Sequence, residues 1–316
     1  DVRIFNTRSL LVEPILQPDR AVRLSRFGAT ITRDTRDRQF DPTRGEFFTT
    51  DYALALKQLG GNLSFGKLLL TYYRYYQLGS SKTRAQRPTL FERRNEPQGI
   101  KHTVFALGVT LGVANLFSPT DRDGNGVIDE AERTLPISER FFSGGSTTLR
   151  GFGFEEAGPR RVICPGTLTT DNAGVEHCAP SIVRDLQGNA VRLNPFTVPI
   201  GGNALAVVNL EARVPLTRLF QVVPFYDGGN VFRRAGDIFS RNKPQPTDTL
   251  DERNLRAQWT HTVGMGLRLR TPFGPLAVDY GFLLNPPSFE IPQFAGPPAI
   301  LRLKHAQIQF RFGQTF

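Results

Sequence analysis

The feature that most constrains the fold is an alternation of apolar and polar residues with a period of two. In one stretch, Val263, Met265 and Leu267 occupy one face, and Gly264, Gly266 and Arg268 occupy the other. This pattern predicts β-strands, because successive side chains of a strand point to opposite faces. Such stretches lie at 26–33, 47–57, 63–76, 102–113, 206–214, 263–269, 276–284 and 306–312. With one more strand expected within 2–15, the sequence predicts an all-β chain of about ten strands.

The lengths of the connections suggest which solvent the apolar faces meet. A soluble sandwich and a membrane barrel both alternate, but a membrane barrel has short turns at one end and long loops at the other. Here 215–220 and 271–275 are short. The long connections are 115–203, 233–258 and 285–304. Because no apolar run approaches the ~18 residues of a spanning helix, we expect an antiparallel transmembrane β-barrel, although the polar segment 79–101 breaks the rule.

Charge and cysteines indicate the surroundings. The formal net charge of +10 favours an anionic partner such as lipopolysaccharide. Nothing resembles a nucleic-acid-binding module, so we expect no nucleic-acid partner. The two cysteines, Cys164 and Cys178, lie in one loop-like stretch, and a bridge between them fits an oxidising compartment.

No catalytic constellation is apparent. The histidines are scattered, and neither a Gly-x-Ser-x-Gly elbow nor a metal-ligand helix occurs. We therefore expect no enzyme and no required cofactor. A barrel enzyme such as a lipase is the alternative, and it would need a nucleophilic serine beside a histidine inside the barrel.

Several motifs occur together in a fixed order. The stretch FFSGGSTTLRGF at 141–152 sets one arginine among small and glycine residues. It is preceded by a turn at 34–45 and followed by strands at 209–215 and 225–232 and a hairpin at 264–280. Together these resemble the BamA/TamA superfamily of outer-membrane assembly barrels. The resemblance implies that 1–316 is the C-terminal portion of a barrel of about sixteen strands, with the remaining strands upstream and 115–203 as a long extracellular loop.

The resemblance also implies a set of site residues, which we call the loop lock: Arg150, Gly151, Phe152, Glu211 and Asp227. In that family the loop arginine reaches into the barrel and pairs with acids on the two following strands. An arginine held by two carboxylates in an enclosed lumen makes strong charge-assisted hydrogen bonds. The alternation agrees, since Glu211 falls on the polar face of its strand.

A calcium motif lies within the long loop. Residues 121–132 match the twelve-residue EF-hand loop, with glycine at the sixth position for the turn. The expected ligands are Asp121, Asp123, Asn125, Val127 through its carbonyl, Asp129 and Glu132. A strand precedes the motif where an EF-hand has a helix, so the alternative is an acidic surface loop.

The chain ends in a pattern similar to the terminal sorting signal of outer-membrane barrels, with Phe310, Phe312 and Phe316 in phase with the apolar face. The family resemblance implies an integral outer-membrane protein that folds and inserts client barrels by strand templating at a lateral seam. Its partners would be lipids and lipopolysaccharide, unfolded outer-membrane clients, periplasmic POTRA domains and accessory lipoproteins. The alternatives are a TamA-like or two-partner-secretion transporter, and then a soluble β protein.

Overall fold

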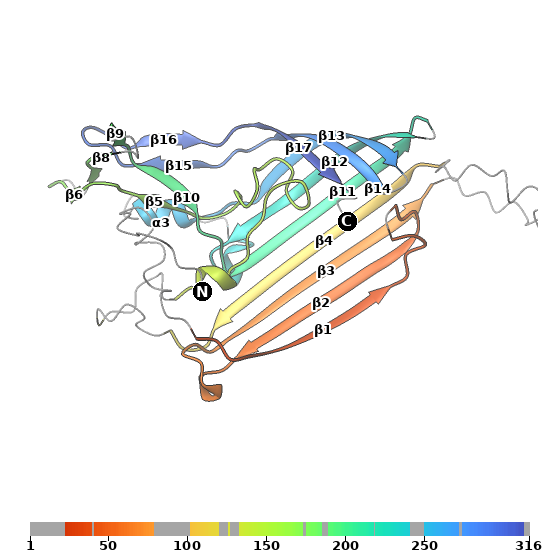
Figure 1. Ribbon diagram of the computed structural model, residues 1–316, viewed down its shortest axis with the longest axis horizontal. Coiled ribbons are helices and arrows are strands. Elements are labelled where there is room, and N and C mark those ends of the chain that lie inside the picture. Colours follow the sequence, from red (N-terminus) through yellow and green to blue (C-terminus); the bar gives the residue numbers. More distant parts are fainter. Residues whose placement is uncertain are drawn as a thin grey trace, which may run out of the picture.

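A computed structural model describes residues 23–39, 41–78, 102–119, 126, 133–172, 175–184, 189–217, 219–240, 250–271 and 274–312. Its main feature is one curved antiparallel sheet of nine strands (Figure 1). In sheet order these are β1 (Arg26–Asp34), β2 (Gly45–Ala55), β3 (Phe65–Gln77), β4 (Val104–Leu116), β11 (Ala204–Pro215), β12 (Phe220–Phe232), β13 (Thr260–Thr271), β14 (Gly274–Leu283) and β17 (Ala306–Phe312). These nine confirm the eight strands expected from the alternation and the strand at 225–232 expected from the family resemblance. The strand expected within 2–15 lies outside the described residues.

The antiparallel order sorts the connections between the two ends of the sheet. The connections β2–β3, β4–β11, β12–β13 and β14–β17 meet at one end, which we call the loop end. The connections β1–β2, β3–β4, β11–β12 and β13–β14 meet at the other, the turn end. Segment 79–101, which breaks the length rule, belongs to the turn end, and it lies outside the described residues. In the described part of the chain, none of the helices is both long and apolar enough to span a bilayer.

The long connections contain secondary structure that the alternation did not predict. Four two-stranded sheets pair β5 (Arg160–Ile163) with β10 (Phe196–Pro199), β6 (Leu168–Thr170) with β7 (Glu176–Cys178), β8 (Ser181–Arg184) with β9 (Ala190–Leu193), and β15 (Ser288–Ile291) with β16 (Ala299–Arg302). Short helices add η2 (Lys57–Leu59), η3 (Ile137–Glu139), η4 (Ala235–Asp237) and α3 (Leu250–Leu255). Strands of three or four residues are too short to show an alternation in the sequence.

The sheet has the polarity of a membrane barrel. On β13 the apolar side chains Val263, Met265 and Leu267 are 40%, 58% and 45% exposed, whereas Thr262 is 1% and Arg268 0% exposed. A soluble sandwich would bury the apolar face and expose the polar one. Here the apolar face is turned outward, as lipid requires, and the polar face is enclosed. The chain therefore forms part of a transmembrane antiparallel β-barrel, and the described sheet is open between β1 and β17.

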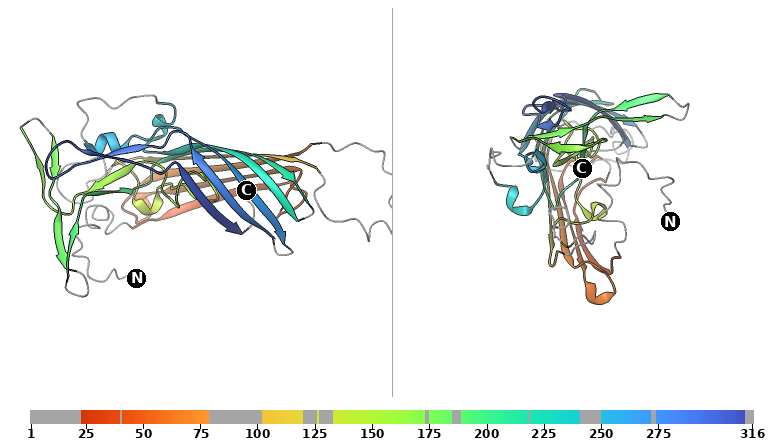
Figure 2. Two further views of the ribbon diagram at one scale, coloured as in Figure 1. Left: turned by 90° about the horizontal axis from the view of Figure 1, so that it is seen from above. Right: turned by 90° about the vertical axis from the view of Figure 1, so that its left-hand side faces the viewer.

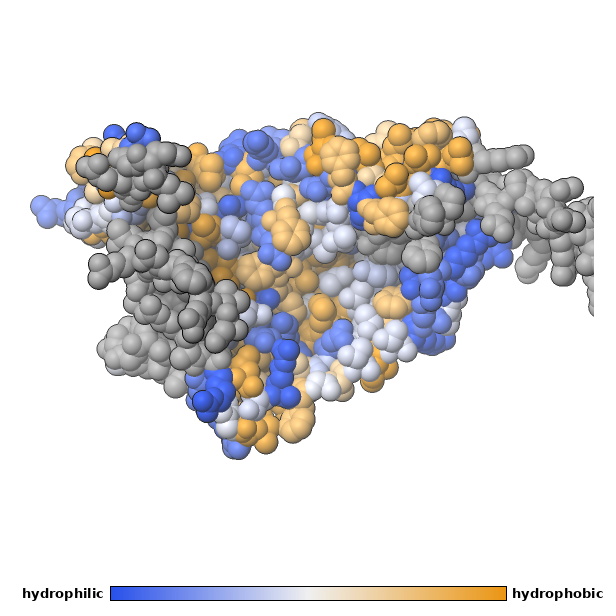
Figure 3. Space-filling view, in the orientation of Figure 1, coloured by the Kyte–Doolittle hydropathy of each residue, from blue (hydrophilic) through white to orange (hydrophobic). Residues whose placement is uncertain are grey.

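The concave side of the sheet holds the inserted loop. Residues 143–158 lie over it in Figure 1, and the same face in Figure 3 mixes hydrophilic with hydrophobic residues. Near the loop end a compact apolar cluster joins the loop to the sheet. Its fully buried members include Phe65, Leu135, Leu149, Phe152, Val231 and Leu283. This cluster packs the loop against the inner wall of the sheet.

Candidate functional site

The inserted loop is held in a compact turn by its own backbone. A bridge between Ser143 and Ala157 closes its base. Gly144 and Gly145 adopt φ angles of 118° and 98°, a left-handed region that favours glycine. The Gly144 amide donates to the Thr148 hydroxyl at 3.0 Å. The turn is followed directly by Arg150, which lies in the inserted loop.

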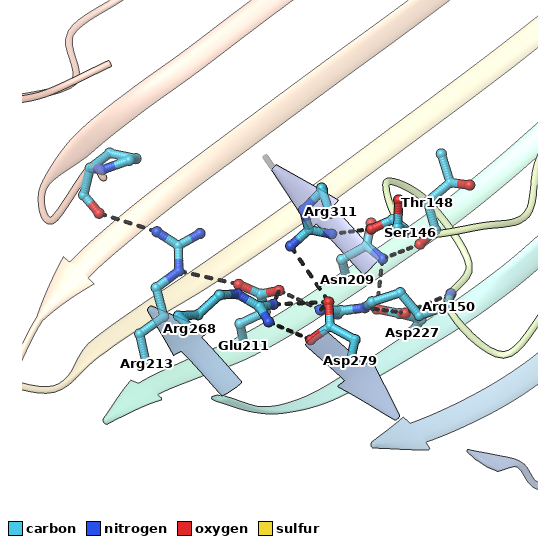
Figure 4. A network of polar contacts seen from close by, with 11 residues as sticks. Ser146, Thr148, Arg150, Asn209, Glu211, Arg213, Asp227, Arg268, Asp279 and Arg311 are labelled. Atoms are coloured by element: carbon cyan, nitrogen blue, oxygen red, sulfur yellow. Dashed lines mark hydrogen bonds and ion pairs between the residues drawn. The ribbon is translucent and has the colours of Figure 1, made fainter. Parts of the chain in front are cut away.

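Arg150 is fully buried between two carboxylates (Figure 4). Its backbone N–H and Nε donate to Asp227 Oδ2 at 3.1 and 2.8 Å, and Nη2 donates to Asp227 Oδ1 at 2.6 Å. Nη1 donates to Glu211 Oε1 at 2.5 Å. The guanidinium carbon also lies 3.5 Å from the centroid of the Phe225 ring. The structure thus brings the predicted arginine and both predicted acids together.

The charge state of Arg150 follows from these neighbours. Burial alone would lower its pKa, but the charges of Asp227 and Glu211 outweigh burial and raise the pKa above its ordinary value. The guanidinium therefore stays protonated. Breaking the contact would take the ion pair with Arg150 from the buried carboxylate of Asp227, which is far more costly than breaking an exposed ion pair.

A wider network, which sequence reasoning missed, surrounds the loop lock. Asp279 on β14 accepts from Arg268 Nη1 at 2.5 Å, and Oδ2 of Asp279 lies 3.5 Å from Arg311 Nη2 and 4.0 Å from Arg150 Nη1. Glu211 is shared, since Arg213 Nε donates to it at 3.2 Å and Arg268 Nη2 lies 3.7 Å away. All these residues fall on the polar faces of the alternating strands. Alternation could therefore have placed them in the lumen, but it could not have paired them.

The loop backbone is tied to several strands. Asn209 Nδ2 on β11 donates to the Thr148 carbonyl and to Asp227 Oδ1, both at 2.7 Å. On β17, Gln309 Nε2 donates to the Phe152 carbonyl at 2.8 Å, and Arg311 Nη1 donates to the Ser146 carbonyl. The loop therefore connects the interior strands with the strand at the edge of the sheet.

Two glycines allow the loop to approach the wall. A Cβ on Gly151 would lie 2.3 Å from Thr262 Oγ1. A Cβ on Gly281, on β14, would lie 2.7 Å from the Arg150 carbonyl oxygen. Any larger side chain at either position would push the loop away from the wall. Glycine at position 151 therefore allows Arg150 to reach its partners. Phe152 is buried in the apolar cluster beside this contact.

The structure places the other predicted residues as follows. A disulfide joins Cys164 and Cys178, whose Cα atoms are 5.7 Å apart. Phe310 and Phe312 point outward from β17, and Phe316 lies outside the described residues. The six expected calcium ligands between 121 and 132 also lie outside them. Within the described ranges, no group of three or more His, Cys, Asp or Glu side chains could hold a metal.

Comparisons with known proteins identify chains similar to this one. A family model described as the Omp85 superfamily domain matches residues 7–316. An outer membrane protein assembly factor BamA from Nitratidesulfovibrio vulgaris (strain Hildenborough) is 25% identical over 257 residues, covering 80% of this chain and 22% of the relative. The crystal structure of BamA from Haemophilus ducreyi lacking POTRA domains 1–3 superposes with a TM-score of 0.51 and 16% identity, over 90% of this chain and 42% of that one. The chain thus spans about a fifth of the curated relative's length.

Proposed function

The chain belongs to the Omp85 superfamily, and from that membership we propose that it is the barrel portion of an integral outer-membrane factor that folds and inserts other β-barrel proteins. The matching relative carries the name of such an assembly factor. The observation that carries the proposal is the edge strand β17, which is supported from inside by the loop lock. The partners would be unfolded outer-membrane clients, together with periplasmic POTRA domains and accessory lipoproteins. No chemical step and no cofactor is part of the proposal.

The edge strand has the features of a template. Among the strands that the structure describes, β17 pairs with β14 alone, in register from Leu276 opposite Phe312 to Phe282 opposite Ala306. An unpaired strand edge presents backbone N–H and C=O groups that can recruit an incoming strand. Phe310 points outward, so a client strand added beside β17 would continue the apolar outer face.

The inner side of β17 supplies the support that a template requires. Gln309 and Arg311 hold the loop backbone, and Arg150 anchors the same loop to β11 and β12. These contacts hold the strand on its lumenal face, away from its outer hydrogen-bonding edge, which pairs with no other strand among the described residues. We propose that the loop lock keeps β17 ordered while its edge exchanges partners with a client strand.

Site-directed crosslinking tests this proposal. Phe310→Cys on β17 and Met265→Cys on the interior strand β13 both place a thiol on the outer face, since the native side chains are 75% and 58% exposed. The full-length protein is reconstituted in phospholipid vesicles and given a urea-unfolded outer-membrane client with single cysteines in its terminal strand. Disulfides to position 310, together with folded client in the vesicle membrane, are the expected result.

Two outcomes would contradict the proposal. Equal crosslinking at 265 and 310 would show that the client does not prefer the edge strand. A client that becomes protected inside the vesicles without entering the membrane would identify a polypeptide transporter of the TamA or two-partner-secretion kind.

A further inference from the structure

We propose that residues 41–44, which we call the strap, close the turn end of the lumen by crossing from β2 to β13. The strap belongs to the connection between β1 and β2. A connection at the end of a barrel normally lies in water, yet Pro42 and Thr43 are buried. The inference concerns the access of water and ions to the part of the lumen that the structure describes, and it does not rest on client insertion.

The strap is bound to the two interior strands next to its own hairpin. Arg44 Nε donates to Gln77 Oε1 on β3 at 2.8 Å. The Pro42 carbonyl accepts from Arg213 Nη1 on β11 at 3.4 Å. Because Gln77 and Arg213 lie on either side of β4, the strap passes over the lumenal face of that strand.

A third contact shows that the strap crosses the lumen. Asp41 Oδ2 accepts from Arg270 Nε on β13 at 3.1 Å. In sheet order β13 is five strands from β2, or about 24 Å along the wall at about 4.8 Å per strand. Four residues of chain reach at most about 14 Å, so the strap crosses the concave side rather than following the wall. The right-hand view of Figure 2 shows the bend that brings the strands together, with the red and orange strands on one wall and the blue strands on another.

The local sequence bends the strap inward and fixes its conformation. Gly45 adopts a φ angle of 95°, and a Cβ there would lie 2.2 Å from the Thr35 carbonyl oxygen, so the bend requires glycine. Asp37 then holds the strap through its carboxylate. Oδ1 accepts from the backbone N–H groups of Thr43 and Arg44 at 2.8 and 3.1 Å, and Oδ2 accepts from the Thr43 hydroxyl at 2.6 Å. Such side-chain bonds to nearby backbone favour a fixed turn over a flexible one.

Val104 marks the space that the strap covers. It is the first residue of β4, at the turn end, yet it is 0% exposed. Its neighbours in the ladder are Gln77 and Arg213, the two side chains that hold the strap. Arg213 also donates to Glu211 at 3.2 Å, so the strap adjoins the charged network of the loop lock (Figure 4). Exclusion of water at this end strengthens the ion pairs of that network, because charges interact more strongly where the dielectric constant is low.

Labelling of a thiol beneath the strap tests the closure. Val104→Cys is introduced into the full-length protein in detergent and reacted with a water-soluble maleimide, while the native cysteines are joined in their disulfide. Replacement of residues 38–43 by Asn-Gly removes most of the strap and keeps the hairpin, because the N–H of Asp37 already donates to the Arg44 carbonyl at 3.2 Å. The shortened variant should label roughly tenfold faster than the Val104→Cys parent, as expected when a local cover is lost. Asp41→Ala should label about fivefold faster, because it removes one ion pair that holds the strap closed.

Two controls accompany the labelling. Asp51→Ala removes a carboxylate from the same strand β2, where it accepts from the Thr30 hydroxyl at 2.6 Å, and it should label like the parent. Leu216→Cys places a thiol on the exposed connection between β11 and β12 at the same end, and it sets the rate for an open position. Its rate should be equal with the native and with the shortened turn. Heat-modifiable gel mobility identifies the variants that are folded.

Three results would overturn the inference. Labelling at position 104 of the parent as fast as at position 216 would show that the lumen is open at this end. A folded shortened variant that labels no faster than the parent would show that another part of the chain covers position 104. Equal rates for Asp41→Ala and Asp51→Ala would show that the contact with Arg270 does not hold the strap, and this comparison decides alone if the shortened variant does not fold. Labelling is measured without a client, so its failure leaves the proposed function untouched.

Discussion

Replacement of Arg150 by alanine should destabilise the barrel by about 3–5 kcal/mol, the usual cost of removing one partner of a buried ion pair. The two acids should not contribute equally. Glu211 would keep Arg213 at 3.2 Å and Arg268 at 3.7 Å, whereas Asp227 would keep two neutral donors, the Asn209 amide at 2.7 Å and the backbone N–H of residue 150 at 3.1 Å. Most of the cost should therefore arise at Asp227, which loses both hydrogen bonds from the guanidinium.

This reasoning predicts strong coupling between the two residues. Arg150→Ala and Asp227→Asn should each be destabilising, and the double variant should be more stable than their sum predicts by about 2 kcal/mol, within the range found for residues of one network. Arg150→Lys keeps the charge but loses the planar fork, so it should be intermediate. The exposed Arg192→Ala is the control.

The assay is urea unfolding of the full-length protein in detergent, followed by the gel mobility that distinguishes folded from unfolded barrels. Midpoints and slopes are compared among the wild type, the single variants and the double variant, because a changed slope would signal an altered unfolded state. Additive effects within about 0.5 kcal/mol would refute the argument, since independent sites behave in that way. Wild-type stability of Arg150→Ala would refute it as well.

Three further predictions follow from particular contacts. Gly281→Ala should lower the free energy of unfolding by about 1–3 kcal/mol and loosen the loop, because the new Cβ would meet the inserted loop backbone. Gly28→Ala, whose Cβ would have its nearest neighbour at 3.5 Å, should have little effect in the same unfolding assay. Unreduced digests should contain linked peptides from Cys164 and Cys178. Replacing both by serine should speed proteolysis between them, because closing a loop of this length stabilises the folded state by about 3 kcal/mol in the chain-entropy model. An unchanged cleavage rate would contradict this. Calcium should protect 118–136 from protease in the intact barrel, and alanine at the first and last acids of the motif should abolish the protection; identical cleavage with calcium and with chelator would leave only an acidic turn.

The strands and the direction of their side chains could be predicted from the local pattern of residues. A period of two is local, so eight of the nine strands and the inward placement of Glu211, Arg268 and Asp279 follow from it. Loop lengths then indicated a membrane barrel, and the outward exposure of the apolar faces confirms that reading. The pairing of Arg150 with its two acids came from a motif resemblance, because spacing along the chain contains no information about distance across a lumen.

Which lumenal charges meet depends on how strands distant in the sequence come together in the sheet. Strand β4 pairs with β11 across the whole inserted loop, and the curvature of the sheet brings β14 and β17 round to the same network. Alternation fixes the face of a residue but not the register between strands that are distant in sequence. For that reason the contact of Arg311 with Asp279 and of Gln309 with the loop backbone could not be predicted, although the alternation of their strands puts each residue on the polar face.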